Sequence, residues 1–482
     1  MSQTAITAPD ALAGRVDRMI QIGRLGAARP LIAALRKLGL AAPRIALLEA
    51  KIALREERIG DALISLDGAI AIADVDPDLR KCRAEARLKN DDPAGAAGDA
   101  AEAVIINRDD PGAKALLGVT LIELQRYNEA RACLAEAVAT DPRHPFYRIG
   151  LAEALSRLGR LKEAEAVLDR AVEIHPVRAD LRGKAMLLRM RQRNFQAVIR
   201  LAADAKANGA ADACVFGLMG HAYSSSGQHE LAAEAYREAL KLCPEDSYVR
   251  HLVAAAGAMP GAERAPPDYL RAVFDGYAER FEPHLITLLY RVPGLIGKII
   301  DAELKTHPRS APPLLDLGCG TGLVGATCAD PRLGRMTGID ISASMLAQAR
   351  QKAIYDELIE ADLPAFLDGE TRRWPLVTAG DVFCYFGDLT MILKRLQPRM
   401  TPDGLLAFSV EELLPDSDGV ILGNSGHALG RLGRYAHSAQ HVRDAAAAAC
   451  FAIEELRHED LRRESDTPVQ GMIVTLRVQS GA

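Results

Sequence analysis

Residues Leu314–Gly322 read LLDLGCGTG, and this stretch decides the fold expected for the second half of the chain. Its apolar start predicts a short buried strand. Three glycines then follow at alternate positions, Gly318, Gly320 and Gly322. Glycine lets a backbone turn tightly and lets a ligand approach it closely. The stretch therefore predicts a ligand-binding turn between a strand and a helix.

Short apolar segments alternate with helical stretches on the C-terminal side of this turn. The expected strands are LLDLG, MTGIDI, LIEADL, LVTAGDVF and LLAFSVEE, with helices near 323–330, 344–356, 364–368 and 388–398. Such alternation is typical of a parallel sheet covered by helices on both faces. Ligands of these sheets bind at the carboxyl ends of the strands.

The glycine turn is compatible with two kinds of cofactor. GTGLVG (Gly320–Gly325) also satisfies the G-x-G-x-x-G fingerprint of dinucleotide binding. Asp316 favours a cationic amino-acid group instead, because a carboxylate repels a pyrophosphate. Two strands close in sequence, 451–460 and 471–478, predict a terminal antiparallel hairpin. A nucleotide-dependent oxidoreductase stays as the weaker alternative.

With these motifs, residues 268–480 resemble class I S-adenosylmethionine-dependent methyltransferases. That resemblance implies a Rossmann-like domain with a mostly parallel seven-stranded sheet. The runs FDGYAERFEPHL (274–285), DLGCGTG (316–322) and GRYAHS (433–438) are similar to a bacterial group of predicted methyltransferases that carry tetratricopeptide repeats. The implied cofactor is S-adenosylmethionine and the implied activity is methyl transfer, with no acceptor named.

The resemblance also implies roles for individual residues. Asp340 ends the second strand, where a carboxylate accepts both ribose hydroxyls. Met345 is expected close to the adenine, Asp362 at its amino group, and Asp381 at the methyl-donor cleft. The full expected cofactor site is Asp316, Gly318, Gly320, Gly322, Asp340, Ile341, Met345, Asp362, Leu363 and Asp381.

The loop 413–440 is the expected source of acceptor-side groups. Methyl transfer from a sulfonium is an in-line displacement, so positioning supplies much of the catalysis. A hydroxyl or carboxylic acid acceptor needs a general base as well. Tyr435 and His437 are the candidate catalytic residues. The competing interpretation is that His437 and Ser438 only cap a helix that begins near Ala439.

Other polar residues are expected near the same cleft. Arg434 can hold an anionic acceptor, and Glu411 and Glu412 close the fifth strand. Tyr277 and His284 are the polar side chains of the segment that precedes the domain. For each of these two, simple packing is an equally good interpretation.

The first half of the chain repeats with a period of 34 residues. Gly118, Ala130 and Leu134 recur as Ala152, Ala164 and Leu168. The repeat resembles the tetratricopeptide repeat, a helical hairpin whose small residues let two helices approach closely. About seven units are expected between residues 10 and 250, strongest at 110–143, 144–177 and 212–246. In the run RNFQA, Phe195 and Ala197 match one residue early, which predicts a shortened turn.

The expected architecture is an all-α solenoid followed by an α/β domain. Its parts are a repeat array (10–256), a linker (257–268), a helical lead-in or lid broken by prolines (269–304) and the methyltransferase domain (305–482). Such arrays present a groove to a protein partner. A scaffold whose second domain binds S-adenosylmethionine without catalysis is the second hypothesis.

Composition excludes several other classes. The net charge is −5, and no block of five Lys or Arg occurs, which argues against broad nucleic-acid binding. No apolar run has membrane-spanning length, and the N-terminus lacks the pattern of a signal peptide, so we expect a cytoplasmic protein. The eight cysteines form no C-x-x-C pair, and no metal site is expected. The oligomeric state stays open.

Overall fold

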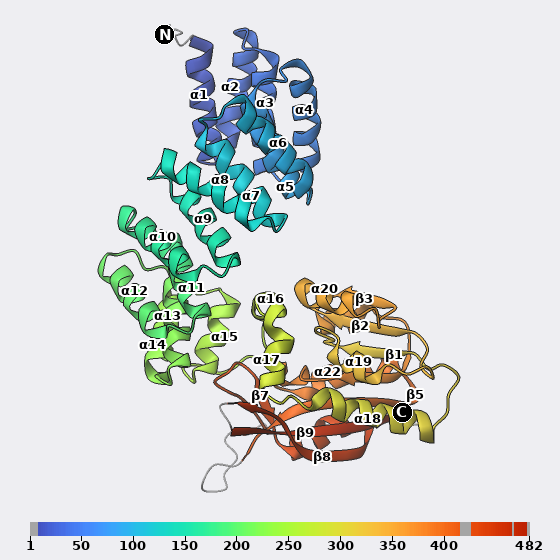
Figure 1. Cartoon of the computed structure of the whole chain (residues 1–482). Coiled ribbons are helices and arrows are strands. Elements are labelled where there is room, and N and C mark those ends of the chain that lie inside the picture. The colour runs from blue at the N-terminus through green and yellow to red at the C-terminus, as the bar shows by residue number, and fades with distance from the viewer. Residues whose placement is uncertain (1–7, 415–425, 465–466, 480–482) are drawn as a thin grey trace. The chain divides into compact units, whose positions relative to one another are not determined.

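The structure is a computed structural model, and it describes residues 8–414, 426–464 and 467–479. The chain divides into two compact units, Met1–Leu218 and Met219–Ala482 (Figure 1). The division falls inside helix α13 (Ala213–Ser225), earlier than the boundary expected at residue 256. The final repeat helices therefore belong to the same compact unit as the α/β domain.

The helices of the first unit confirm the repeat array. They are α1 (Ala8–Gln21), α2 (Leu25–Lys37), α3 (Ala42–Arg55), α4 (Ile59–Ile72), α5 (Pro77–Lys89), α6 (Pro93–Ile106), α7 (Pro111–Glu123), α8 (Tyr127–Thr140), α9 (Pro145–Arg157), α10 (Leu161–Ile174), α11 (Ala179–Arg191) and α12 (Phe195–Ala207). From α5 onward, every second helix begins 34 residues after its counterpart. Together with α13 and α14 (His229–Leu242), the described residues form seven helical hairpins.

Small residues set the distance between the repeat helices. A Cβ atom built on Gly118 of α7 would lie 2.5 Å from Cγ of Leu134 in α8, and one on Gly150 of α9 would lie 2.8 Å from its Cδ2. Leu134 is fully buried between these two glycines. The predicted close approach of repeat helices is thus confirmed at this position.

The shortened turn expected near Phe195 is wrong. Helix α12 begins at Phe195, 34 residues after Leu161 begins α10, and three residues precede each helix. Val198 is fully buried at the place that Ala164 takes in the preceding repeat. The match of Ala197 one residue early was a coincidence of composition, because alanine is frequent throughout these helices.

The predicted linker is hydrogen-bonded to the α/β domain. After α14 and α15 (Ser247–Ala255), residues 262–265 run beside 385–387: the Ala265 N–H donates to Tyr385 O (2.8 Å), and the Gly387 N–H donates to Glu263 O (2.7 Å). The Tyr435 hydroxyl donates to Ala262 O at 2.5 Å. Glycines and prolines here shape an extended, paired segment and not a free tether.

The predicted lead-in has two different parts. Its first part consists of α16 (Pro267–Asp275), the 3-10 turn η1 (Ala278–Arg280) and α17 (Phe281–Thr287). Pro283 lies in the first turn of α17, where a missing N–H costs little, and does not break the helix. The second part, α18 (Val292–Thr306), is a core helix, with Ile296 and Ile300 buried against the sheet. The lid expected over 269–304 therefore ends near residue 288.

The predicted α/β sheet is confirmed. Its strands are β1 (Leu314–Leu317), β2 (Met336–Asp340), β3 (Glu357–Glu360), β4 (Trp374–Ala379), β5 (Met400–Glu412), β6 (His427–Leu429), β7 (Tyr435–His437), β8 (Phe451–Glu464) and β9 (Thr467–Val478). Strands run in the order β3-β2-β1-β4-β5, all parallel, and β9 pairs antiparallel with β5 and β8. The terminal hairpin is thus where it was expected.

The sheet has nine described strands where seven were expected. The two extra strands, β6 and β7, pair antiparallel with each other, and β7 joins the end of β5 through Glu411 and Glu412. Both extra strands are three residues long and come from the predicted loop 413–440. Residues 415–425 of that loop lie outside the described residues.

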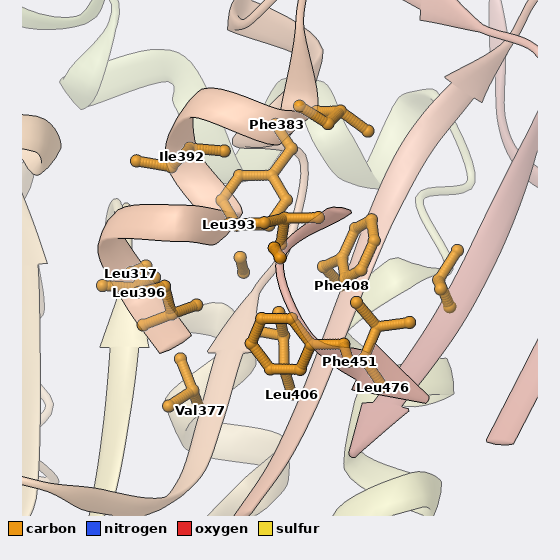
Figure 2. Packing of buried hydrophobic residues seen from close by; sticks show 14 of the residues in the cluster. Leu317, Val377, Phe383, Ile392, Leu393, Leu396, Leu406, Phe408, Phe451 and Leu476 are labelled. Atoms are coloured by element: carbon orange, nitrogen blue, oxygen red, sulfur yellow. The ribbon is translucent and has the colours of Figure 1, made fainter. Parts of the chain in front are cut away.

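Helices cover both faces of the sheet. Consecutive residues of a strand, such as Leu314 and Leu315, point to opposite faces of the sheet. One face packs against α18 and α19 (Leu323–Cys328). The other packs against α21 (Leu363–Gly369), α22 (Leu389–Leu396) and α23 (Ala439–Ala448), and Figure 2 shows Phe383, Phe408 and Phe451 in this core. Helix α20 (Ala343–Gln351) follows β2. This two-sided burial fixes the strand ends that carry the site.

Candidate functional site

A cavity of about 290 Å³ lies at the carboxyl ends of β1 to β4. Loops after these strands form one wall, and α16, Tyr277 and α17 form another. Eight of the ten residues expected at the cofactor site line it: Gly318, Gly320, Asp340, Ile341, Met345, Asp362, Leu363 and Asp381. Asp316 and Gly322 do not.

The glycine loop needs its first glycine for steric reasons. Gly318 has φ +61°, and a Cβ there would lie 2.3 Å from Cγ2 of Val382. Gly320 is open on its cavity side, since a Cβ would meet only a ring carbon of Phe281, at 3.9 Å. The Cys319 side chain is buried in the loop. The loop thus offers bare backbone to a ligand.

Two carboxylates of neighbouring strands differ in their access to the cavity. Asp340 lines it, and its oxygens accept the N–H groups of Gly320 (2.8 Å) and Ser342 (2.9 Å). Asp316 is fully buried beneath the loop, where it accepts the hydroxyls of Tyr355 (2.6 Å) and Thr378 (2.8 Å). The expected contact of Asp316 with a ligand is therefore corrected, because both of its oxygens face other side chains.

Burial controls the protonation of both carboxyl groups. Desolvation raises the pKa of Asp316 to about 6, although the hydroxyls of Tyr355 and Thr378 oppose that rise. Burial also raises the pKa of Asp340, against the hydrogen bonds from Ser342 and Gly320. Asp340 therefore presents a carboxyl group that is oriented by backbone donors and partly shielded from water.

Asp362 is held by a residue that the sequence did not indicate. Arg264 binds its carboxylate with both terminal nitrogens, at 2.8 and 3.0 Å. The extended pairing of residues 262–265 brings Arg264 to this place. Ser342 caps α20 by accepting the Met345 N–H at 3.1 Å, and Met345 lines the cavity.

A charged cluster lies beside Asp381. Arg462 of β8 donates to Asp381 at 3.2 Å, to Glu464 at 2.9 Å and to Glu411. Arg434 contacts Glu411 (2.8 Å) and Glu464 (2.7 Å). Two guanidinium groups thus face three carboxylates. Neighbouring Glu411 raises the pKa of Arg434 against its burial, and Arg434 lowers the pKa of Glu464 against its burial.

Sequence reasoning identified only part of this charged cluster. Arg434 and Asp381 line the cavity as expected, and Glu411 reaches it through the two arginines. Glu412 instead contacts His458 at 2.9 Å. Arg462 and Glu464 were missed because they lie on the terminal hairpin, where no motif marks them.

Aromatic rings form the wall opposite the sheet. Phe274, Tyr277 and Phe281 line the cavity, and Tyr277 and Phe281 meet edge to face with ring centroids 5.4 Å apart. The Tyr277 hydroxyl is hydrogen-bonded to Nδ1 of His284, which also lines the cavity. The structure thus brings together the two polar lead-in residues that the sequence singled out.

The same segment is tied to helix α20 at both ends. The Ser342 hydroxyl donates to Asp275 at 2.6 Å. Near the other end of α20, Lys352 contacts Glu282 and donates to Thr321 O at 2.6 Å. These bonds hold the aromatic wall over the glycine loop.

The two expected catalytic residues do not line the cavity. His437 is fully buried, neither ring nitrogen has a hydrogen-bond partner among the described residues, and burial lowers its pKa to about 3. Tyr435 is buried too, with its hydroxyl on Ala262 O. Ser438 caps α23 by accepting the His441 N–H at 3.1 Å. The competing interpretation, a cap before α23, thus holds for Ser438, and the structure assigns the predicted pair to packing.

Within the described residues, no group of three His, Cys, Asp or Glu side chains is arranged to hold a metal ion. None of the described helices has the length and apolar character needed to cross a membrane.

Known families match three segments of the chain. Residues 315–406 match a family described as "Methyltransferase domain". Residues 115–179 and 215–246 match families described as "Tetratricopeptide repeat". The chain therefore combines tetratricopeptide repeats with a methyltransferase domain, as the motifs predicted.

Curated relatives match a limited part of the chain. The chain is similar to methyltransferase-like protein 27 of Homo sapiens, at 38% identity over 85 residues, which are 18% of this chain and 34% of that protein. It is also similar to the biotin biosynthesis bifunctional protein BioCD of Bordetella avium, at 34% identity over 142 residues, 28% of this chain and 29% of that protein. The matched segments thus span about a third of these relatives.

Two solved structures are similar to parts of the chain. A tetratricopeptide repeat protein from Parabacteroides merdae has 18% identity and a TM-score of 0.38, covering 52% of this chain and 98% of its own. Magnesium protoporphyrin IX methyltransferase from Synechocystis, with bound SAM, has 15% identity and a TM-score of 0.33, covering 44% and 97%.

Proposed function

We propose that the second unit is an S-adenosylmethionine-dependent methyltransferase. The observation that carries the proposal is the position of Asp340: its carboxylate ends β2 and borders the cavity beside the open backbone of Gly320. A carboxylate at the end of the second strand is the usual acceptor for ribose hydroxyls in doubly wound sheets. S-adenosylmethionine, the cofactor, carries such a ribose.

The residues around the cavity fit the other parts of this cofactor. Asp362, fixed by Arg264, offers an acceptor for the adenine amino group, and Met345 offers an apolar contact for its ring. The cluster beside Asp381 has one more carboxylate than guanidinium groups, which favours a positive charge nearby. When bound, the cofactor supplies a methyl group activated by a sulfonium. Asp381 and the aromatic wall orient that end and exclude water.

Calorimetry on the full chain tests the proposal. We expect binding of S-adenosylmethionine and S-adenosylhomocysteine and no binding of NAD. Asp340→Asn should weaken both sulfur ligands roughly 10- to 100-fold, because a charge-assisted hydrogen bond contributes about 1.5–3 kcal/mol. Asp368→Asn is the matched control, since this exposed carboxylate lies on α21 and pairs only with Arg395 among its described partners. Binding of NAD in place of the sulfur ligands would reject the proposal.

We further propose that the repeat array holds a protein partner that presents the methyl acceptor. Support comes from a groove of about 550 Å³ in the second unit, lined by helices α13 to α15 and by residues 431–433. Tyr269 and Leu432 line both this groove and the cavity. Labelled-methyl transfer to a bacterial lysate, split into protein and metabolite fractions, tests this. Label confined to the metabolite fraction would contradict it.

A further inference from the structure

The ring of Tyr277 belongs to the aromatic wall described above, but its hydroxyl group and the imidazole of His284 have no part in holding the cofactor as proposed. Tyr277 is half-buried and lines the cavity, whereas His284 is exposed at its rim. The phenol oxygen is hydrogen-bonded to Nδ1 of the imidazole. In the tautomer that carries its proton on Nε2, Nδ1 accepts the phenol proton. The pair therefore connects the cavity to solvent through two groups that exchange protons.

The rings around Tyr277 place it close to the glycine loop. Phe281 contacts both: a Cβ built on Gly320 would lie 3.9 Å from one of its ring carbons, and its ring meets that of Tyr277 edge to face, at 86°. Phe274 meets Tyr385 edge to face at 5.7 Å on the next stretch of wall. A wall of rings favours a flat aromatic ligand, because aromatic groups prefer edge-to-face and offset contacts with one another.

We propose that Tyr277 and His284 are the catalytic pair that accepts the acceptor's proton, and that the acceptor is a phenolic hydroxyl group. This inference rests on the proposed function. The phenol oxygen of the acceptor bonds to the methyl carbon while the carbon–sulfur bond breaks, and the electron pair of that bond stays on sulfur. The acceptor's proton passes to the Tyr277 oxygen, and the proton of Tyr277 passes to Nδ1 of His284. The positive charge thus moves from sulfonium to imidazolium.

The charged groups around Tyr277 keep its hydroxyl protonated. Tyr277 can therefore pass a proton on to His284, but it does not act as an ionised base. Burial raises the pKa of Tyr277, Arg280 and Arg434 oppose that rise, and Glu464 adds to it. Tyr277 therefore stays protonated and passes a proton on, while His284 is its only described hydrogen-bond partner. His284 is exposed, so it can release the proton to water between turnovers.

A structural role for the pair makes a different prediction. If the Tyr277–His284 hydrogen bond only fixes the turn between η1 and α17, any hydrogen-bond acceptor at the position of Nδ1 should keep full activity. His284→Asn keeps such an acceptor, because the amide oxygen lies near that position, but it cannot take up a proton. Tyr277→Phe removes the hydroxyl and keeps the ring. The comparison of the two variants separates proton transfer from packing.

The experiment uses 4-nitrophenol as the probe, whose anion absorbs visible light. It is added to the full chain saturated with S-adenosylhomocysteine, at a pH below the pKa of the free probe. We expect the wild type to bind it as the phenolate and both variants to bind it as the neutral phenol. Equal spectra for wild type and His284→Asn would overturn the proposal, as would the absence of binding to the wild type.

Two controls separate this inference from the proposed function. Calorimetry should show that both variants bind S-adenosylhomocysteine like the wild type; loss of sulfur-ligand binding in the wild type itself would reject the proposed function instead. With labelled S-adenosylmethionine and the same phenol, His284→Asn should lower kcat roughly 10²- to 10⁴-fold, the usual contribution of a general base. Its remaining rate should rise with pH as the acceptor ionises by itself. A wild-type pH profile in His284→Asn would contradict the relay.

Discussion

Two aspartates at the ends of adjacent strands show how register assigns different roles to the same residue type. Asp316 pairs with Gly338 inside the sheet, whereas Asp340 follows two residues later, at the last pair of β2 with β3. The first carboxyl group is enclosed by Tyr355 and Thr378, and the second reaches the cavity. Burial without a cationic partner makes Asp316 a weak acid that organises the loop from below.

Asp316→Asn tests this role through pH. A carboxyl whose pKa rises on folding, here from 3.8 to about 6, binds its proton more tightly in the folded state. Wild-type stability therefore falls as the pH rises from about 4 to about 6, by at most ~3 kcal/mol for a shift of about two units. The variant lacks this titrating group. Its free energy of unfolding should therefore increase relative to that of the wild type as the pH rises over that range. Urea denaturation at several pH values measures the difference.

The control is again Asp368→Asn, whose carboxyl group is largely exposed and paired with Arg395. Its difference from the wild type should stay constant between pH 4 and pH 7, apart from about 0–1 kcal/mol for a surface ion pair. A difference between Asp316→Asn and the wild type that does not change with pH would show that Asp316 is not a raised, buried acid.

Residue roles were predictable from sequence where the backbone itself sets them. Gly318 and Asp340 were found because their spacing along the chain fixes their place after β1 and β2. The partner of Asp362, Arg264, lies 98 residues earlier, and no local pattern reports such a pairing. His437 was misplaced for a similar reason: polar type suggested the cleft, but the short strand β7 buries it.

At the scale of elements, periodicity predicted most helices and strands because packing enforces it. The five parallel strands and the terminal hairpin follow apolar patterns of length four or more. The pair β6 and β7 escaped prediction, since three residues per strand leave no readable alternation. Helix α18 was assigned to the lid because its apolar face is compatible with either burial against the sheet or cover over the cavity.

The turn between β1 and α19 is the element on which ligand binding depends most. Gly318→Ala would force a Cβ to within 2.3 Å of Val382 at φ +61°. Left-handed backbone alone costs about 1–2 kcal/mol for a residue with a Cβ. Relief of the clash should shift the loop into the cavity, so we expect S-adenosylhomocysteine binding to weaken at least tenfold by calorimetry.

A second glycine provides the matched control for that substitution. Gly369 ends α21, has no positive φ, and a Cβ there meets no atom within 4 Å. Gly369→Ala should therefore keep wild-type affinity. If the two alanine variants bind the ligand equally well, the glycine loop does not form the floor of the ligand site.

At the scale of the whole molecule, the repeat period and the compact units end at different places. The 34-residue period continues through α13, α14 and the start of α15, but the compact division falls after Leu218. The last repeat helices are bound to the α/β domain through side chains: Nε2 of His251 is 3.1 Å from Gly433 O, and its ring lies 4.4 Å from that of Tyr269. Sequence periodicity marks where a motif ends, whereas burial decides which parts fold together.

This difference predicts the stability of two fragments. A fragment of residues 257–482 begins at the boundary that the sequence suggests, and one of residues 213–482 keeps α13 to α15. The shorter fragment exposes Tyr269, which is buried in the full chain and also contacts the Tyr248 ring at 5.3 Å. Loss of one large buried aromatic contact costs roughly 1.5–3 kcal/mol. At about 2–4 °C per kcal/mol for a domain of this size, Tm should fall by roughly 3–12 °C.

Loss of the residues that cover Tyr269 should also disturb the cavity, because Tyr269 lines the cavity as well as the groove beside α15. Residues 257–482 should thus bind S-adenosylhomocysteine more weakly than 213–482, and the longer fragment should match the full chain in both Tm and affinity. Differential scanning calorimetry and isothermal titration on the two fragments measure both quantities. Equal Tm values for the two fragments would mean that the repeat array ends energetically where its sequence period ends, and that α15 supports neither the fold nor the site.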